Sequence, residues 1–155
     1  MKKTTPRLVI CAALILFLLG FIWGNSCLNG ETSGQFSGWV GQLLCTIFPF
    51  LSPEHPYGHF ILRKLGHFSE FAALGLCLSW LYGMLMERKL PMLGLPLLCG
   101  MAAAAVDETI QIFTPGRNCS IVDVGIDTFG VITGILVLHL IVRNLPRLLH
   151  RKNAK

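Results

Sequence analysis

Four apolar stretches, each about as long as a membrane crossing, alternate with shorter polar segments along the chain. They cover residues 8–24, 61–86, 92–113 and 121–142. Because a helix needs roughly 20 apolar residues to cross a hydrocarbon core of ~30 Å, each stretch predicts one transmembrane helix. We therefore expect an all-α membrane protein in which residues 1–155 form a single transmembrane domain.

The segment between the first two stretches, residues 25–60, is mixed in character and contains one further helical pattern. Its apolar positions recur at helical spacing, at Phe36, Val40, Leu43, Leu44 and Ile47. Such a stripe, with Trp39 beside it and glutamines on the other faces, predicts a short helix that lies in the membrane interface of the first outer loop. Prolines then end it, at positions 49, 53 and 56.

The links between the other helices carry turn and capping residues. Thr114-Pro115-Gly116-Arg117 joins the third and fourth stretches, with Pro and Gly in the order of a type II turn. Ser120 and Asp123 have the spacing of a capping pair at the start of the fourth helix. The first stretch has the position of a signal peptide, but it is long and no A-x-A-like site follows it, so we expect it to be retained.

The chain is 53% hydrophobic and 14% charged, which leaves too little polar sequence to cover a water-soluble domain. Its net charge is +5, but no aromatic and basic residues are interleaved as in nucleic-acid modules, so we expect no nucleic-acid partner. With the N-terminus in the cytoplasm, ten of the thirteen Lys and Arg residues face the cytoplasm. The charges therefore predict a multi-pass cell-membrane protein with both termini cytoplasmic.

Small residues predict which helices lie close together. They occur at Ala72, Ala73 and Gly75, at Gly100 and 102–105, and as a GxxxG step at Gly130 and Gly134. We therefore expect the last three transmembrane helices to pack closely and the first to be a peripheral, lipid-facing helix. Six cysteines show no metal-finger spacing, and a disulfide among Cys27, Cys45 and Cys119 remains an open alternative.

Ionisable side chains converge at the outer ends of the last three transmembrane helices. Arg63, His67 and Glu70 share one face of the second helix, whereas Asp107 and Gln111, then Asp123 and Asp127, are pairs four residues apart. Lys64, Glu108 and Arg117 lie at the same depth. Ionisable groups inside a membrane are costly, at roughly 2.5–3.5 kcal/mol each at the centre, so they persist where they are paired or functional. We favour a binding or catalytic site over the alternative of a structural salt-bridge network.

Three linked segments of this cluster resemble the signature of the VanZ-like family. They are Arg63-Lys64-x-x-His67-Phe68-x-Glu70-Phe71, then Asp107-Glu108-x-x-Gln111-x-Phe113-x-Pro115-Gly116-Arg117, then Asp123 and Asp127 with Gly130. Phe71 stands where the family often has Tyr, and Asp127 where Asn is frequent. The resemblance implies a bacterial cell-envelope protein of a type named for teicoplanin resistance, in a family whose molecular activity is not settled.

Roles can be assigned to individual residues as hypotheses. His67, Glu70 and Asp107 are the candidate catalytic groups, with His67 as a proton carrier. The candidate substrate-binding residues are Arg63, Lys64, Glu108, Gln111, Arg117, Asp123 and Asp127. Arg117 is the best candidate to grip a phosphate or carboxylate, against the alternative of pairing with Asp123 or Glu108. Neighbours on a helix diverge by ~100°, so Asp107 and Glu108 should point in different directions.

We expect neither a metal nor a cofactor, because the adjacent Arg and Lys side chains would repel a cation and suit an anion. The leading interpretation is an outward-facing pocket that binds or modifies an anionic lipid-linked or cell-wall-related substrate. The alternative is a non-catalytic scaffold or accessory subunit. A channel is disfavoured because the polar residues gather at one depth and mark no path across the bilayer.

Overall fold

The computed structural model of the chain describes residues 5–49, 52, 55, 57–86 and 93–152. They form five helices: α1 (Thr5–Ser26), α2 (Gly30–Leu44), α3 (Gly58–Leu85), α4 (Gly94–Ile112) and α5 (Ile121–Lys152). No strand occurs among these residues. The expected all-α architecture is therefore confirmed, while residues 87–92, near the junction of the second and third apolar stretches, and the prolines at 53 and 56 fall outside the described residues.

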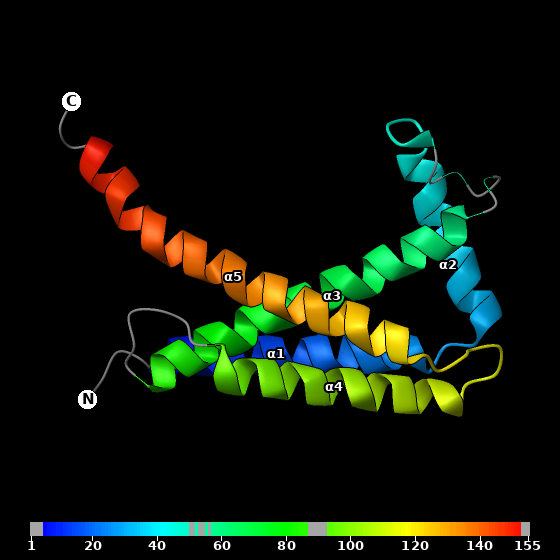
Figure 1. Cartoon of the computed structure of the whole chain (residues 1–155), viewed down its shortest axis with the longest axis horizontal. Coiled ribbons are helices and arrows are strands. Elements are labelled where there is room, and N and C mark those ends of the chain that lie inside the picture. Colours follow the sequence, from blue (N-terminus) through cyan, green and yellow to red (C-terminus); the bar gives the residue numbers. More distant parts are fainter. Residues whose placement is uncertain (1–4, 50–51, 53–54, 56, 87–92, 153–155) are drawn as a thin grey trace.

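Four of the helices are long and apolar enough to cross a membrane, namely Pro6–Ser26, Gly58–Leu85, Gly94–Ile112 and Ile121–Asn144. They match the four predicted stretches to within a few residues. The exception is α5, which continues as a helix beyond its apolar part to Lys152. Figure 1 shows α1 beginning and α5 ending at the same end of the bundle, with α2 and the α4–α5 link at the other. The chain is a multi-pass membrane protein.

The helices α3 and α5 cross with their backbones in close contact, because glycines occupy the crossing. A methyl group at Gly134 would overlap the carbonyl oxygen of Ala72, and one at Gly75 would overlap that of Val131. Gly130 also lies in this contact, because a methyl group there would be 2.5 Å from the carbonyl oxygen of Phe68. The GxxxG prediction is thus confirmed, and these small residues permit the close approach.

The position of α1 differs from the prediction of a peripheral helix. One of its faces is exposed, with Leu16 70% exposed, but the opposite face buries Cys11, Ile15 and Ile22 in the core. The indole of Trp23 also donates a hydrogen bond to the carbonyl of Ala103 in α4, at 3.3 Å. A helix rich in Leu and Ile has no distinct small-residue stripe, so its buried face could not be recognised from composition.

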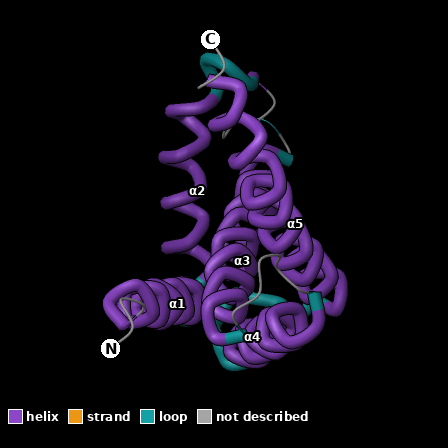
Figure 2. The backbone as a smooth tube through the Cα atoms, turned by 90° about the vertical axis from the view of Figure 1, so that its left-hand side faces the viewer, coloured by secondary structure: helices purple, strands orange, loops and turns teal. Residues whose placement is uncertain are grey.

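The predicted short helix exists as α2, with Asn29 as its N-cap accepting a hydrogen bond from the backbone N–H of Thr32 at 2.8 Å. It ends at Leu44, so Ile47 lies just beyond it. In Figure 2, α2 is seen lengthwise while α1 and α4 are seen nearly end-on, so α2 lies across the end of the bundle. Trp39 and Leu43 on it are exposed. Its location in a membrane interface stays a prediction.

The link between α4 and α5 folds back on the end of α1. Gly116 has φ 73°, and the N–H of Arg117 donates to the carbonyl of Thr114 at 3.1 Å, as the type II turn requires. The N–H of Gly30 donates to the Pro115 carbonyl at 3.1 Å, and a methyl group at Gly30 would overlap Gly116.

All six cysteines have free thiols, so the structure contains none of the disulfides left open by the sequence.

Candidate functional site: a buried polar cluster at one end of the bundle

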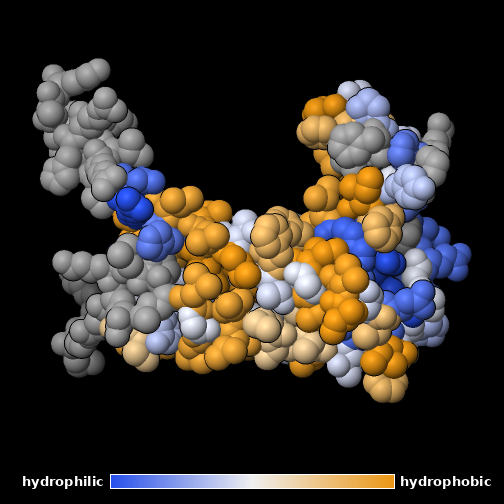
Figure 3. Space-filling model, in the orientation of Figure 1, coloured by the Kyte–Doolittle hydropathy of each residue, from blue (hydrophilic) through white to orange (hydrophobic). Residues whose placement is uncertain are grey.

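Hydrophilic side chains gather at the end of the bundle beside α2, whereas hydrophobic side chains cover its middle (Figure 3). The predicted site residues lie at this end. Arg63, Lys64, His67 and Glu70 come from the first half of α3, Asp107, Glu108 and Gln111 from the end of α4, Arg117 from the following link, and Asp123 and Asp127 from the start of α5. The predicted convergence of three helices is therefore observed, and the end of α1 joins it.

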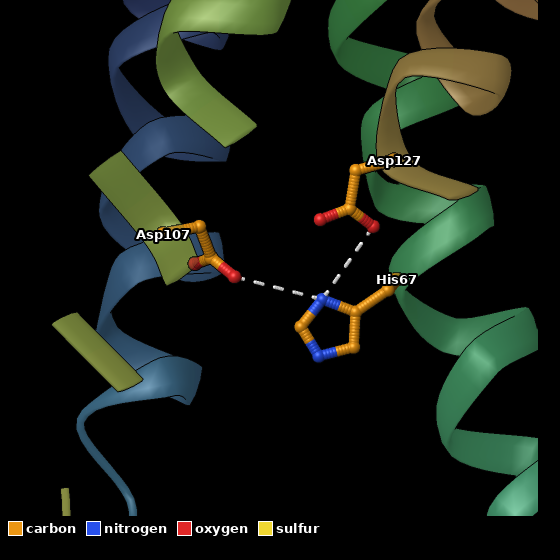
Figure 4. A group of neighbouring side chains, drawn as sticks. All are labelled: His67, Asp107 and Asp127. Atoms are coloured by element: carbon orange, nitrogen blue, oxygen red, sulfur yellow. Dashed lines mark ion pairs between the residues drawn. The ribbon is translucent and has the colours of Figure 1, made fainter. Parts of the chain in front are cut away.

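The centre of the cluster consists of one histidine between two aspartates from other helices (Figure 4). His67 Nδ1 lies 3.7 Å from Asp107 Oδ2 and 3.9 Å from Asp127 Oδ1. Asp107 and Asp127 are 0% exposed. His67 Nδ1, Asp107 Oδ1 and both oxygens of Asp127 accept or donate no hydrogen bond within the described part of the chain. Buried polar atoms are normally paired, so this triad has unused binding capacity.

The close crossing of α3 and α5 explains why these three side chains meet. His67 is one turn before Phe71, whose Cβ lies beside Gly130, and Asp127 is less than one turn before Gly130. Asp107 follows the buried Ala103 and Ala104 by one turn on α4. Small residues at the contacts of α3, α4 and α5 therefore bring three polar side chains within reach of one another.

Glu70 lies beside the triad and contacts α1. Its Oε1 accepts a hydrogen bond from Asn25 Nδ2 at 3.4 Å, and its buried Oε2 has no hydrogen-bond partner among the described residues. Asn25 was absent from the predicted site. A signal for it was available in the sequence, because Asn25 and Ser26 are polar residues directly after the first apolar stretch, at the end where the other site residues lie.

Gln111 connects the two adjacent acids of α4 with α1. Its amide nitrogen lies 3.0 Å from Asp107 Oδ2, 3.2 Å from Glu108 Oε1 and 3.4 Å from Ser26 Oγ. Gln111 is 3% exposed, and Ser26 is fully buried. A neutral amide donor therefore holds two buried carboxylates in place without neutralising either.

The predicted divergence of Asp107 and Glu108 is only partial, because both are buried and each has an oxygen within 3.2 Å of the Gln111 amide nitrogen. Asp107 faces His67, whereas Glu108 Oε2 accepts a hydrogen bond from the backbone N–H of Ser120 at 2.8 Å. Ser120 is the residue before α5, and its Oγ accepts from the N–H of Val122 at 3.2 Å. Ser120 thus acts as the predicted N-cap, but the carboxylate that accepts the hydrogen bond from its N–H belongs to Glu108 rather than to Asp123.

Asp123 pairs instead with Lys64, across the α3–α5 contact. The Lys64 ammonium also lies 5.1 Å from the ring centroid of Phe60, within the range of a cation–π contact. Both members of the pair are mostly buried, at 17% and 15% side-chain exposure. Two of the predicted substrate-binding residues are therefore paired with each other.

Arg117 has a role that the sequence did not reveal. Its Nε donates to the carbonyl of Leu28 at 3.3 Å and one terminal nitrogen donates to that of Asn25 at 3.1 Å, so the guanidinium caps the end of α1. No ion pair joins it to Asp123 or Glu108 in the part of the chain that the structure describes. Burial lowers the pKa of the Arg117 guanidinium from its ordinary value, and the nearby charge of Arg63 lowers it further.

Two basic positions retain capacity for an anion. The remaining terminal nitrogen of Arg117, Nη1, is buried and has no partner among the described residues. Arg63 is half-buried and likewise makes no hydrogen bond or ion pair with any described residue. His59, four residues before Arg63 on α3, lies against Gly38 of α2.

The cluster therefore divides into two sets of residues. Lys64, Glu108, Gln111 and Asp123 are used in contacts between helices, as is most of Arg117. His67, Glu70, Asp107 and Asp127 retain buried atoms without a hydrogen-bond partner, and Arg63 has no ion pair with a described residue. The sequence could identify the members of the cluster but not this division, because it depends on which side chains meet across helices.

Comparison with known proteins gives a match to a family model, but none to an individual protein. No curated protein and no solved structure matches the chain. The model of the VanZ/LLP1 family, however, matches residues 8–142, which include every helix crossing and every residue of the polar cluster. The chain therefore belongs to the VanZ/LLP1 family of membrane proteins.

Proposed function

We propose that this protein binds an anionic lipid-linked molecule of the cell envelope, with the polar head in the buried cluster and the hydrocarbon chain between helices. The single observation that carries this proposal is an apolar groove of about 280 Å³ between α1, α3 and α4. Ligand sites commonly combine an apolar cavity with a few convergent polar groups.

The groove begins where the polar cluster ends. Ala103, which lines it, is one turn from Asp107 on α4, and Leu74 is one turn from Glu70 on α3. The remaining lining comes from Leu19, Trp23, Leu78, Cys99, Ala102 and Val106. A molecule with a charged head and a long apolar chain matches this arrangement. Its head would lie in the polar cluster and its chain in the apolar groove.

The unpartnered residues fit the head of such a ligand. Arg63 and the free nitrogen of Arg117 supply donors for phosphate or carboxylate oxygens. His67, Glu70 and Asp107 supply groups that could accept or donate a proton if the head is modified. Binding is the core of the proposal, and the reaction class is left to experiment.

A lipid-binding measurement tests the proposal directly. Purified protein would be titrated in detergent with a polyprenyl phosphate, and binding counted by native mass spectrometry, beside the matching polyprenyl alcohol. We expect the phosphate to bind at least about tenfold more tightly, since a charge-assisted hydrogen bond contributes about 1.5–3 kcal/mol. Equal affinity for phosphate and alcohol would contradict the proposal.

The groove itself is tested by a blocking substitution with a matched control. Ala102→Phe fills the groove, whereas Leu16→Phe adds a ring to the exposed face of α1 outside it. We expect the first to weaken phosphate-lipid binding by at least about tenfold and the second to change it less than about twofold. The same variants can be compared for survival under a lipid-anchored glycopeptide, because the family resemblance implies teicoplanin resistance.

The scaffold alternative is supported by a specific observation of its own. Arg117, Glu108 and the Lys64–Asp123 pair all join one helix to another, as expected of residues that fix helix packing. If His67→Gln, Glu70→Gln and Asp107→Asn all lost protein from the membrane, the scaffold interpretation would replace lipid binding. Stable variants that lose lipid binding would exclude it.

A further inference from the structure

We propose that His67, Asp107 and Asp127 bind a divalent transition-metal ion, of the type of Mn²⁺ or Zn²⁺. One ligand atom from each residue lies within 4.8 Å of the other two. The three residues come from three helices, α3, α4 and α5, and Figure 4 shows their side chains pointing toward a common point. An imidazole nitrogen with carboxylate oxygens is a donor set that suits these metals.

The distances agree with coordination. A metal 2.0–2.3 Å from each of two ligands separates those ligands by about 3.3–3.8 Å at a tetrahedral angle. The separations from His67 Nδ1 to Asp107 Oδ2 and Asp127 Oδ1 are 3.7 Å and 3.9 Å. They are too long for direct hydrogen bonds, but a small contraction of the side chains would bring all three atoms into a coordination shell.

A second, independent observation is the unpartnered state of these buried atoms. Asp127 is 0% exposed and neither of its oxygens has a hydrogen-bond partner among the described residues, and the same holds for Asp107 Oδ1 and His67 Nδ1. An uncompensated carboxylate in an apolar interior is very costly, whereas one that coordinates a metal is not. The His67 side chain is 11% exposed, so the centre is not completely enclosed.

The charges of the described cluster also favour a cation. After Lys64 and Asp123 neutralise each other, four carboxylates (Glu70, Asp107, Glu108 and Asp127) face two guanidinium groups (Arg63 and Arg117). One divalent ion would balance the difference. The sequence-based expectation of no metal assumed that the basic side chains would repel a cation, but Lys64 is paired and Arg117 is held by the carbonyls of α1.

A bound metal would also explain how an acidic cluster receives an anionic head, because the ion can bridge carboxylates and a phosphate oxygen. This bridging step rests on the proposed lipid binding, but the metal site itself does not. The two are therefore tested in separate measurements.

The metal site is tested with full-length protein, without an affinity tag, stripped by a chelator and titrated with Mn²⁺. The loss of the free Mn²⁺ signal in electron paramagnetic resonance counts the bound ions. We expect one ion per chain, and Asp127→Asn should weaken binding by at least about tenfold, in line with the effects of perturbing metal sites. Glu31→Gln, which removes an exposed carboxylate of α2 outside the cluster, should change affinity less than about twofold.

Electron spin-echo measurements on wild-type protein provide a readout that does not depend on the stability of the Asp127 variant. Bound Mn²⁺ should show modulation from an imidazole nitrogen, retained in His59→Gln and lost in His67→Gln. Absence of saturable binding, absence of nitrogen modulation, or equal losses in Glu31→Gln and Asp127→Asn would overturn the metal site. Lipid binding that is unchanged by the chelator would overturn only the bridging step, and metal binding without lipid binding would contradict only the proposed function.

Discussion

The backbone N–H of Ser120, at the start of α5, donates its hydrogen bond to the side chain of Glu108 on α4. A capping acid normally comes from the third residue of the same helix, which here is Asp123. Because Glu108 takes that place, Asp123 is available to pair with Lys64 on α3. These two contacts therefore connect the start of α5 with both α3 and α4.

This arrangement predicts different effects for two substitutions of Glu108. Glu108→Gln keeps an oxygen that can accept from the Ser120 N–H, so the melting temperature in detergent should change little. Glu108→Ala leaves that donor and the Gln111 amide without this acceptor, and should destabilise the protein by about 1–2 kcal/mol. Equal melting temperatures for the Ala and Gln variants would show that the cap contributes nothing.

The Lys64–Asp123 pair predicts a coupling between two substitutions. Lys64→Met alone leaves a mostly buried carboxylate without its partner and should cost about 3 kcal/mol, whereas Lys64→Met with Asp123→Asn should cost much less. A double-mutant cycle of unfolding free energies measures the difference. Strictly additive effects would mean that the two charges do not stabilise each other.

The close crossing of α3 and α5 predicts a large effect at Gly134. Any side chain there would overlap the Ala72 backbone, so Gly134→Leu should destabilise the fold by more than about 3 kcal/mol or prevent its accumulation. Leu16→Ala is the matched control, because Leu16 is 70% exposed, and it should change stability by less than about 0.5 kcal/mol. Similar melting shifts for the two would contradict the observed packing.

The orientation in the membrane remains a prediction from the charges. Single cysteines at Asn118 and Asn153, introduced after the native cysteines are replaced, should differ in their labelling in whole cells. Asn118 follows Arg117 at the cluster end and should react with an impermeant thiol reagent, whereas Asn153 should not. The reverse pattern would place the polar cluster on the cytoplasmic side.

The sequence was sufficient for the helices because their length and apolar character are local properties. The charged residues that share a depth, from Arg63 to Asp127, could also be recognised, since helix spacing determines which of them share a face. The buried face of α1 could not be recognised, because a uniformly apolar helix has no pattern that marks its packed side. The polar residues Asn25 and Ser26 at its end were a signal of the site, but their partners were not predictable. The hydrogen bond of Glu108 and the pairing of Asp123 likewise depend on contacts between helices.

Substitutions of Arg117 distinguish most clearly between a ligand-binding role and a structural role of this residue. Its Nε and one terminal nitrogen hold the carbonyls of Leu28 and Asn25, while Nη1 is unpartnered among the described residues. Arg117→Lys keeps the charge but has a single nitrogen, so it cannot hold both carbonyls and a ligand at once. We expect this variant to lose about 1–2 kcal/mol of stability and at least about tenfold in phosphate-lipid affinity.

Arg117→Ala removes both functions and should cost about 3 kcal/mol, since two partly buried carbonyls lose their donor and the neighbouring carboxylates lose a nearby cation. The decisive comparison is between melting temperature and lipid affinity for Arg117→Lys, measured on the same preparation. A variant that melts lower but binds the phosphate lipid as wild type does would show that Arg117 acts only as the cap of α1. In that case Arg63 would be the remaining described side chain able to hold the anionic head directly, and Arg63→Gln should then abolish the preference for phosphate over alcohol.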